Sequence, residues 1–329
     1  MGGTIVLAGD VGGTKTYLAA YNPKENGFTP LYEARYTTRD YENTGALLAA
    51  FVEESTLTPQ RVVLGVPGPV RQLPVRAVNL PWMIDPEQIK ERLGIDQVFL
   101  LNDLQATSYG TLALEASDLH TLNAGERDEE GNVAVIAAGT GLGEGGLVWS
   151  GQRYVSIASE GGHSTFSPSS ELEAELGRYL KRQHDHVSWE RVTSGPGLAS
   201  IYDFMCEREP ERESAWLREA LTEGDRSNVI ANAALEETCE LASEAMNFFV
   251  YLYGCEAGNL ALKLMSTGGL FVGGGIAPKI IARLRNSRFM EGFLHKGRMR
   301  QALESIPVHV VLNDKTALLG AAYWGAQDD

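Results

Sequence analysis

Three glycine-rich segments, each directly after a run of apolar residues, are the parts of this sequence best suited to hold a phosphate group. They cover residues 9–14, 139–143 and 273–275. Glycine lets the backbone turn with positive φ and lets a phosphate approach the amides of the turn closely. One such segment alone is equally typical of a plain hairpin turn. Phosphate binding is therefore a hypothesis that needs support from the rest of the chain.

The first two segments share a pattern, seen in IVLAGDVGGTKTYLAAY and VAVIAAGTGLGEGGLVW. Each predicts a strand, a glycine turn and a second strand, which is a hairpin. This internal repeat indicates two similar lobes, each presenting a glycine turn. A P-loop or a Rossmann motif needs a helix after the turn, and Thr14 replaces the second P-loop glycine, so neither motif fits.

A carboxylate follows another apolar run, at Asp103 in the segment LLND. Transfer of a phosphoryl group to an alcohol needs positioning, charge neutralisation and a carboxylate that accepts the hydroxyl proton. Asp103 suits that base. The alternative is that Asn102 and Asp103 only end a strand and cap the next helix.

Three further polar residues, Glu160, His163 and Glu190, are candidates for binding a sugar. Carboxylates and imidazole form directional hydrogen bonds with adjacent hydroxyl groups. The alternatives are a structural histidine at His163 and a surface carboxylate at Glu190, which lies in a charged, helix-like stretch.

Length and charge limit the classes of protein to consider. The chain has 329 residues, more than the usual size of one hydrophobic core, so two lobes are expected. Its net charge of -15 excludes nucleic acid and anionic membranes as expected partners. Backbone amides, a lysine and a metal ion still let an acidic protein bind ATP.

The cysteines and the apolar runs predict a cytoplasmic protein. No two of the three cysteines are spaced as CxxC, and all three are predicted to be reduced thiols. The apolar N-terminal run is predicted to be a strand and not a signal peptide, and no run reaches the ~20 residues that span a bilayer.

The remaining pattern predicts an α/β protein. Short apolar runs at 61–66, 98–101, 270–272 and 308–312 are typical of strands. A helix is expected at 86–93 with Asp85 as its N-cap, and another at 317–324. Helical periodicity runs from 228 to 263, although Gly254 and Gly258 interrupt it.

Six motifs now carry a resemblance to a known family. GDVGGTK, LNDLQA, GTGLG, EGGH, ERVTSGPG and GGGI follow one another in this order. In this the chain resembles the bacterial glucokinase family, which belongs to the actin-like, hexokinase-type ATPase superfamily. The resemblance runs from about residue 4 to about residue 325.

The resemblance implies an α/β fold of two RNase H-like lobes with the active site in the interlobe cleft. The small lobe would cover 1–111 plus 315–329, and the large lobe 112–314. Sugar binding is expected to close the cleft and exclude water. Cofactors would be ATP and Mg²⁺, the acceptor glucose or a similar hexose, and the assembly a homodimer.

The resemblance also assigns roles to residues. Asp103 would be the catalytic base that takes the proton of the sugar 6-hydroxyl. The sugar would be bound by Asn102, Asp103, Glu160, His163 and Glu190. Asp10 would hold the Mg²⁺. The nucleotide would contact Gly9, Asp10, Val11, Gly12, Gly13, Thr14, Gly139, Thr140, Gly141, Gly273, Gly274 and Gly275.

Several alternatives stay open. The acceptor can be another hexose and the donor polyphosphate, and Lys15 can touch a phosphate or point to solvent. The segment Asn79, Leu80, Pro81 and Trp82 resembles one that lines the sugar cleft.

Two other protein classes and one metal role are disfavoured. A sugar-sensing regulator needs a DNA-binding helix-turn-helix before the first strand, which is expected to start at Thr4. An actin-like polymerising or chaperone ATPase has no use for the candidate sugar-binding residues. A zinc role for His163, as in the related ROK family, is not expected, because the next cysteine is Cys206.

Overall fold

The computed structural model describes residues 4–77, 80 and 82–327. The chain folds as two compact units. Unit 1 comprises Met1–Ala116 and Asn313–Asp329, and unit 2 comprises Ser117–Leu312. The sequence predicts lobe boundaries at 111/112 and 314/315. In the structure the units divide after residue 116 and after residue 312. Each unit is described by itself.

Unit 1 is built on a mixed sheet of five strands, which are β1 (Val6–Val11), β2 (Lys15–Tyr21), β3 (Pro30–Thr37), β4 (Arg61–Val66) and β7 (Gln97–Asn102). Their order is β3-β2-β1-β4-β7. β2 runs antiparallel to its neighbours β1 and β3, whereas β1, β4 and β7 are parallel. β4 is buried at every residue, as expected for a parallel strand covered on both faces.

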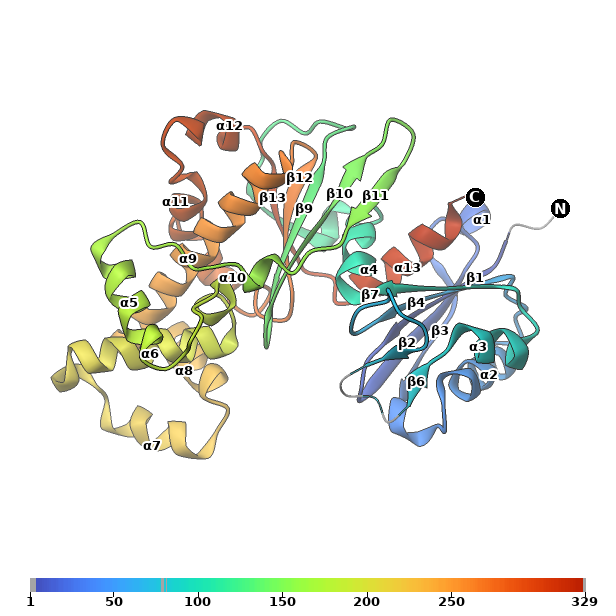
Figure 1. Cartoon of the computed structure of the whole chain (residues 1–329), viewed down its shortest axis with the longest axis horizontal. Helices are drawn as coiled ribbons and strands as arrows, with labels where there is room; N and C mark the ends of the chain where they lie inside the picture. The colour runs from blue at the N-terminus through green and yellow to red at the C-terminus, as the bar shows by residue number, and fades with distance from the viewer. Residues whose placement is uncertain (1–3, 78–79, 81, 328–329) are drawn as a thin grey trace. The chain divides into compact units, whose positions relative to one another are not determined.

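The helices of unit 1 are α1 (Pro23–Asn26), α2 (Thr44–Ser55), α3 (Pro86–Leu93), α4 (Asp103–Gly110) and α13 (Thr316–Ala326), with a small second sheet of β5 (Val75–Arg76) and β6 (Met83–Ile84). α3 begins with Asp85 as N-cap and Pro86 in its first turn, as predicted. The returning C-terminal helix α13 lies beside α4 (Figure 1). A Cβ on Gly320 would lie 1.7 Å from the carbonyl oxygen of Ala106, so only glycine permits this close crossing.

Unit 2 carries a sheet of six strands, which are β8 (Leu119–Asn123), β9 (Val133–Ala138), β10 (Leu142–Trp149), β11 (Tyr154–Ile157), β12 (Gly269–Gly273) and β13 (Val308–Val311). Their order is β11-β10-β9-β12-β13-β8. β9 pairs antiparallel with β10 and parallel with β12, and β12 pairs parallel with β13. Strands β11-β10-β9-β12-β13 thus repeat the order and directions of β3-β2-β1-β4-β7. The internal repeat predicted from the two hairpins is confirmed by this duplicated sheet.

The helices of unit 2 are α5 (Glu171–Lys181), α6 (Gly195–Arg208), α7 (Ala215–Glu223), α8 (Arg226–Leu235), α9 (Glu240–Leu264), α10 (Ile281–Leu284), α11 (Arg288–Leu294) and α12 (Arg300–Glu304). Figure 1 shows α5 to α11 gathered on one side of the sheet. The core between them is made largely by α9, which is buried along most of its length. No helix among the described residues is both long and apolar enough to span a bilayer.

The helical periodicity predicted across residues 228–263 is divided between two helices. The chain breaks after α8, where Glu237 takes a φ of 55°, and α9 starts afresh at Glu240. The expected interruption at Gly254 and Gly258 is also absent, because α9 continues through both. A Cβ on Gly254 would lie 1.9 Å from the carbonyl oxygen of Phe289. These glycines therefore let α11 pack tightly against α9.

Candidate active site

Two carboxylates lie at the same edge of the sheet of unit 1. Asp10 is the fifth residue of β1, and Asp103 follows the last residue of β7. Because β1, β4 and β7 are parallel, their carboxyl ends meet at this edge, where open α/β sheets bind ligands. Burial and then the negative charge of Asp103 raise the pKa of Asp10 to about 6. The sheet thus brings together the two side chains predicted to hold the metal and to act as base.

The helix cap at this edge is formed by Asn102. Its Oδ1 accepts a hydrogen bond from the Leu104 amide at 3.0 Å, and its own amide donates to Gln105 Oε1 at 3.1 Å. Its Nδ2 donates to the carbonyl oxygen of Gly68 at 3.1 Å. Asn102 therefore caps α4, as the alternative considered for this pair expected, and this role does not use all of its hydrogen-bonding groups. A second amide hydrogen and a second lone pair remain for a ligand.

Asp103 is held differently from Asn102. Its side chain is exposed, while Oδ1 accepts a hydrogen bond of 2.8 Å from the Leu104 amide. This bond fixes the carboxylate at the first turn of α4, where the helix dipole favours its negative charge. A fixed and exposed carboxylate suits a general base.

The first glycine turn is shorter than predicted. Gly9, Asp10 and Val11 belong to β1 and all pair with β2. Gly9 and Asp10 also pair with β4. Gly9 serves packing, because a Cβ there would lie 2.6 Å from Leu64 Cδ2. The turn itself is residues 12–14, in which the Gly12 amide donates to the Lys15 carbonyl oxygen. A phosphate held here would meet the amides of Gly13 and Thr14 at the tip.

The second glycine turn, Gly139 to Gly141, is anchored at both ends by one segment of the chain. The carbonyl oxygen of Gly139 accepts a hydrogen bond of 2.8 Å from the Gly195 amide. Three residues further on, the Leu142 amide donates to Glu190 Oε2 at 3.1 Å. Thr140, at the tip, is exposed. Segment 190–195 therefore holds this turn in place.

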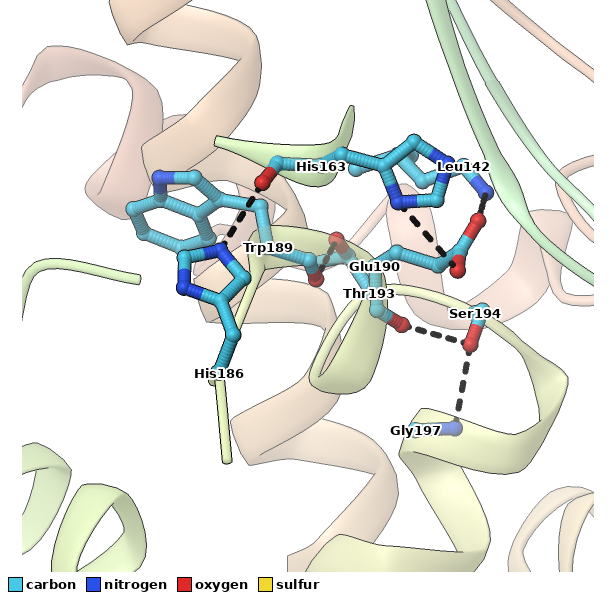
Figure 2. A network of polar contacts seen from close by, with 8 residues as sticks. All are labelled: Leu142, His163, His186, Trp189, Glu190, Thr193, Ser194 and Gly197. Atoms are coloured by element: carbon cyan, nitrogen blue, oxygen red, sulfur yellow. Dashed lines mark hydrogen bonds and ion pairs between the residues drawn. The ribbon is translucent and has the colours of Figure 1, made fainter. Parts of the chain in front are cut away.

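Glu190 also faces the candidate sugar-binding histidine. Its Oε1 lies 3.8 Å from His163 Nδ1, and Figure 2 shows the carboxylate between the Leu142 amide and the imidazole ring. The main chain of Glu190 is fixed as well, because Ser194 Oγ donates to its carbonyl oxygen at 2.6 Å. Glu190 lies in a short 3₁₀ helix, Trp189–Arg191, and not in the helix-like surface stretch considered from the sequence.

His163 ends a second 3₁₀ turn, Gly161–His163, whose N-cap residue is Glu160. The side chains of Glu160 and His163 are exposed. His186 Nε2 donates to the carbonyl oxygen of His163 at 3.0 Å and the Trp189 amide donates to that of Ser164, which ties the two 3₁₀ turns together. Unit 2 therefore brings Glu160, His163 and Glu190 near the second glycine turn.

A pocket of about 520 Å³ opens beside this turn, within unit 2. This volume lies in the range of small-molecule sites. Its lining residues are Gly139, Thr140, Gly195, Pro196, Leu198, Asp225, Ser227, Asn228, Ala231, Gly275, Ile276, Lys279 and Ile280. The lining thus combines the second glycine turn, which suits a phosphate, with apolar side chains such as Ile276 and Ile280, which suit a base. A nucleotide requires both.

The three glycines predicted beside the nucleotide have different roles. Gly273 is the last residue of β12, and Gly274 has a φ of 82° and packs on Ala138, where a Cβ would lie 2.4 Å from the carbonyl oxygen. Only Gly275 lines the pocket, and a Cβ there meets no atom within 4 Å.

Sequence reasoning missed most of the pocket wall on α8 and after β12. Asp225 caps α8 by accepting from the Asn228 amide, and Lys279 lies beyond the third glycine segment. No motif marks these residues; the cap before a helix was their one available signal. Of the segment predicted to line the sugar cleft, Asn79 and Pro81 lie outside the described residues, while Trp82 Nε1 donates to Thr44 Oγ1 at 3.0 Å.

Solved structures place the fold in a class of enzymes. A crystal structure of glucokinase from an Antarctic psychrotroph is 32% identical to this chain, with a TM-score of 0.88 over 98% of both chains. A ROK family glucokinase from Streptomyces griseus, solved with glucose and AMPPNP, is 21% identical with a TM-score of 0.62 over 98% of this chain and 100% of its own. The fold is that of the two-lobed, actin-like sugar kinases of the hexokinase type.

Sequence comparisons then narrow the class to one family. Residues 7–328 match the family model described as Glucokinase. The chain is 43% identical to a glucokinase of Synechocystis sp. over 99% of both chains, and 39% identical to one of Nostoc punctiforme over 98% of this chain and 99% of the relative. The chain belongs to the glucokinase family, as its six motifs indicated, and is an ATP-dependent hexose kinase.

Proposed function

We propose that this enzyme transfers the γ-phosphate of ATP to the 6-hydroxyl of glucose, with Asp103 as the base. Asp103 is exposed at the carboxyl end of a parallel strand and is fixed by the Leu104 amide. It accepts the hydroxyl proton as the new O–P bond forms and the bond to ADP breaks. Asn102, next to it, donates to a neighbouring hydroxyl with the amide hydrogen that Gly68 does not use.

The observation that carries the proposal is the double engagement of Glu190. One carboxylate oxygen holds the second glycine turn through the Leu142 amide, and the other faces His163. In this proposal one side chain, Glu190, both binds a sugar hydroxyl and positions a phosphate-binding turn. Such a link suits an enzyme that brings a hydroxyl group and a phosphate together.

The nucleotide occupies the pocket of about 520 Å³ in this proposal. Its phosphates lie toward the amides of Thr140 and Gly141, and its base lies toward Ile276 and Ala231. Asp103 belongs to unit 1, and the residues that line this pocket belong to unit 2.

Asp10 fits the Mg²⁺ that accompanies ATP. Its carboxylate is partly buried beside a second carboxylate, and this like-charge neighbour helps to raise its pKa. Carboxylate oxygens are suitable ligands for a hard cation, and among the described residues there is no cluster of three or more potential metal-binding side chains. Phosphate oxygens and water would complete the shell. Such a cation would neutralise charge on the phosphates during transfer.

A coupled assay tests the function. Purified enzyme is given ATP or polyphosphate with glucose, fructose, mannose and an amino sugar in turn, and the phosphorylated sugar is quantified. We expect ATP-dependent turnover with the highest kcat/KM for glucose. A higher kcat/KM for another hexose, or turnover with polyphosphate alone, would replace glucose or ATP in the proposal, and no turnover with any hexose would refute it.

The proposal also includes a cytoplasmic homodimer, which is supported by the family resemblance. Light scattering on the eluted protein tests the assembly: a mass near twice 35.7 kDa supports the dimer, and a mass near 35.7 kDa contradicts it.

A further inference from the structure

Two buried carboxyl groups meet in unit 2, outside the residues assigned above. Glu144 on β10 is 2% exposed and Glu256 on α9 is 0% exposed. Glu256 accepts hydrogen bonds from Asn259 Nδ2 at 2.7 Å and from Lys263 Nζ at 3.2 Å. Glu256 therefore has a cation and a donor of its own, whereas Glu144 faces Glu256.

Glu144 has an unmet hydrogen-bonding requirement as long as both groups are ionised. Its Oε1 is buried without a partner. A buried, unpaired carboxylate is costly, and two such charges against one lysine are more so. A proton on Glu144 removes the problem, because the carboxyl gains an O–H group that donates to the ionised Glu256. Burial, and then the charge of Glu256, raise the pKa of Glu144 to about 8, against the opposing effect of Lys263.

The carboxyl group of Glu144 touches the turn that carries the candidate sugar-binding residues. A Cβ on Gly161 would lie 2.2 Å from Glu144 Oε2. The next residue, Gly162, packs equally closely on the main chain of β10, where a Cβ would lie 2.1 Å from the Leu142 carbonyl oxygen. The Gly161–His163 turn therefore rests directly on Glu144 and on the strand that carries it.

We propose that Glu144 is a positioning residue for the sugar: its protonated carboxyl supports the Gly161–His163 turn, and loss of the proton shifts the turn and weakens sugar binding. This inference rests on the proposed function, because it takes Glu160 and His163 to bind the sugar. Nothing in the sequence motifs points to Glu144, which lies just beyond the second glycine turn.

The groups that face Glu144 define what happens when it ionises. They are Glu256 and Lys263 on α9, and the buried Tyr253 of the same helix also senses its charge. On the other side the turn carries Glu160 and His163, both exposed. When Glu144 ionises, its carboxylate is repelled by Glu256. The carboxylate then moves against the backbone of Gly161, which it contacts, and so displaces the short turn. Sugar affinity should respond more than the chemical step.

The pH dependence of the glucose KM tests the inference. If only the protonated form binds well, a pKa of about 8 lowers the competent fraction about tenfold between about pH 7 and about pH 9. We expect the glucose KM of the wild type to rise by roughly that factor relative to Glu144→Gln, whose neutral amide cannot ionise, while kcat changes with pH alike in both. Glu144→Ala, which lacks the supporting group, should have a raised KM at every pH.

Glu240→Gln is the matched control. Glu240 lies on the same helix as Glu256 but its side chain is 82% exposed, so its variant should follow the wild type. A glucose KM that rises with pH equally in Glu144→Gln and in the wild type would overturn the inference, while leaving the proposed kinase activity intact.

A second measurement is independent of turnover. Folding raises the pKa of Glu144 from 4.5 to about 8. Between these two pH values the folded state therefore binds more protons than the unfolded state. Its contribution to stability therefore falls as the pH rises through the window. We expect the Tm of the wild type to fall relative to that of Glu144→Gln over this range. A Tm difference that stays constant with pH would refute the buried proton, whatever the activity of the enzyme.

Discussion

Replacing Asp103 by asparagine separates its chemical role from its structural one. Asparagine has the same shape, and its Oδ1 can still accept the 2.8 Å hydrogen bond that the Leu104 amide donates to Asp103. Asn102 keeps the capping box with Gln105. The favourable charge at the start of α4 is lost, worth about 0.3–1 kcal/mol, and so is the repulsion between Asp103 and Asp10. The variant should therefore fold normally, with a small change in Tm.

The loss of activity should be much larger. A positioned general base contributes about 100- to 10,000-fold to the rate, and this range corresponds to about 3–5 kcal/mol of transition-state stabilisation. We expect kcat of Asp103→Asn to fall by that factor. Nucleotide binding should persist, because the residues that line the pocket belong to unit 2.

The assay is coupled glucose phosphorylation, with nucleotide affinity measured separately by calorimetry. Asp96→Asn is the matched control, since Asp96 is exposed and precedes the same strand that Asp103 follows. Its kcat should equal that of the wild type. A kcat for Asp103→Asn within about tenfold of the wild type would show that no general base acts at this position, since the smallest expected effect is about 100-fold.

Three further changes test other parts of the structure. Glu190→Ala removes the charged acceptor of the Leu142 amide, so kcat/KM for glucose should fall about 10- to 100-fold, and an unchanged value would exclude the double role of Glu190. Ala231→Phe fills the pocket and should raise the KM for ATP by at least about tenfold at an unchanged glucose KM; equal affinity for ATP would place the nucleotide elsewhere. Gly320→Ala forces a methyl group onto a carbonyl oxygen and should lower the free energy of unfolding by about 3 kcal/mol in urea titrations, whereas Gly177→Ala in α5 has room and should be neutral or stabilising.

The fold was predictable where a local pattern decides the structure. Both glycine hairpins and the helix that starts at Pro86 follow from apolar spacing, turn residues and a capping aspartate. The break between α8 and α9 was not predictable, because Glu237 takes a left-handed conformation without glycine or asparagine to signal it. Gly254 misled for the opposite reason: its lack of a side chain serves packing against α11 and does not interrupt α9.

The places of some candidate residues at the ends of strands were predictable, but the contacts between candidate residues were not. Asp103 is marked by its position after an apolar run, and the structure confirms that it follows β7. The contact between Glu190 and the Leu142 amide joins residues 48 apart in the chain, and no periodicity encodes it. The same holds for the wall of the candidate nucleotide pocket, to which the start of α6, α8 and the segment after β12 contribute.

The glycines of the motifs show why a motif predicts a site better than it predicts mechanism. Gly9 makes room for Leu64, Gly12 closes the first turn with Lys15, and Gly274 makes room for Ala138. Among the motif glycines of unit 2, Gly139, Gly195 and Gly275 line the pocket. Several of these glycines therefore serve the packing and the turns of the candidate phosphate-binding segments. The same reasoning applies to Gly161, whose missing side chain is what allows the Glu144 carboxyl group to reach the Gly161–His163 turn.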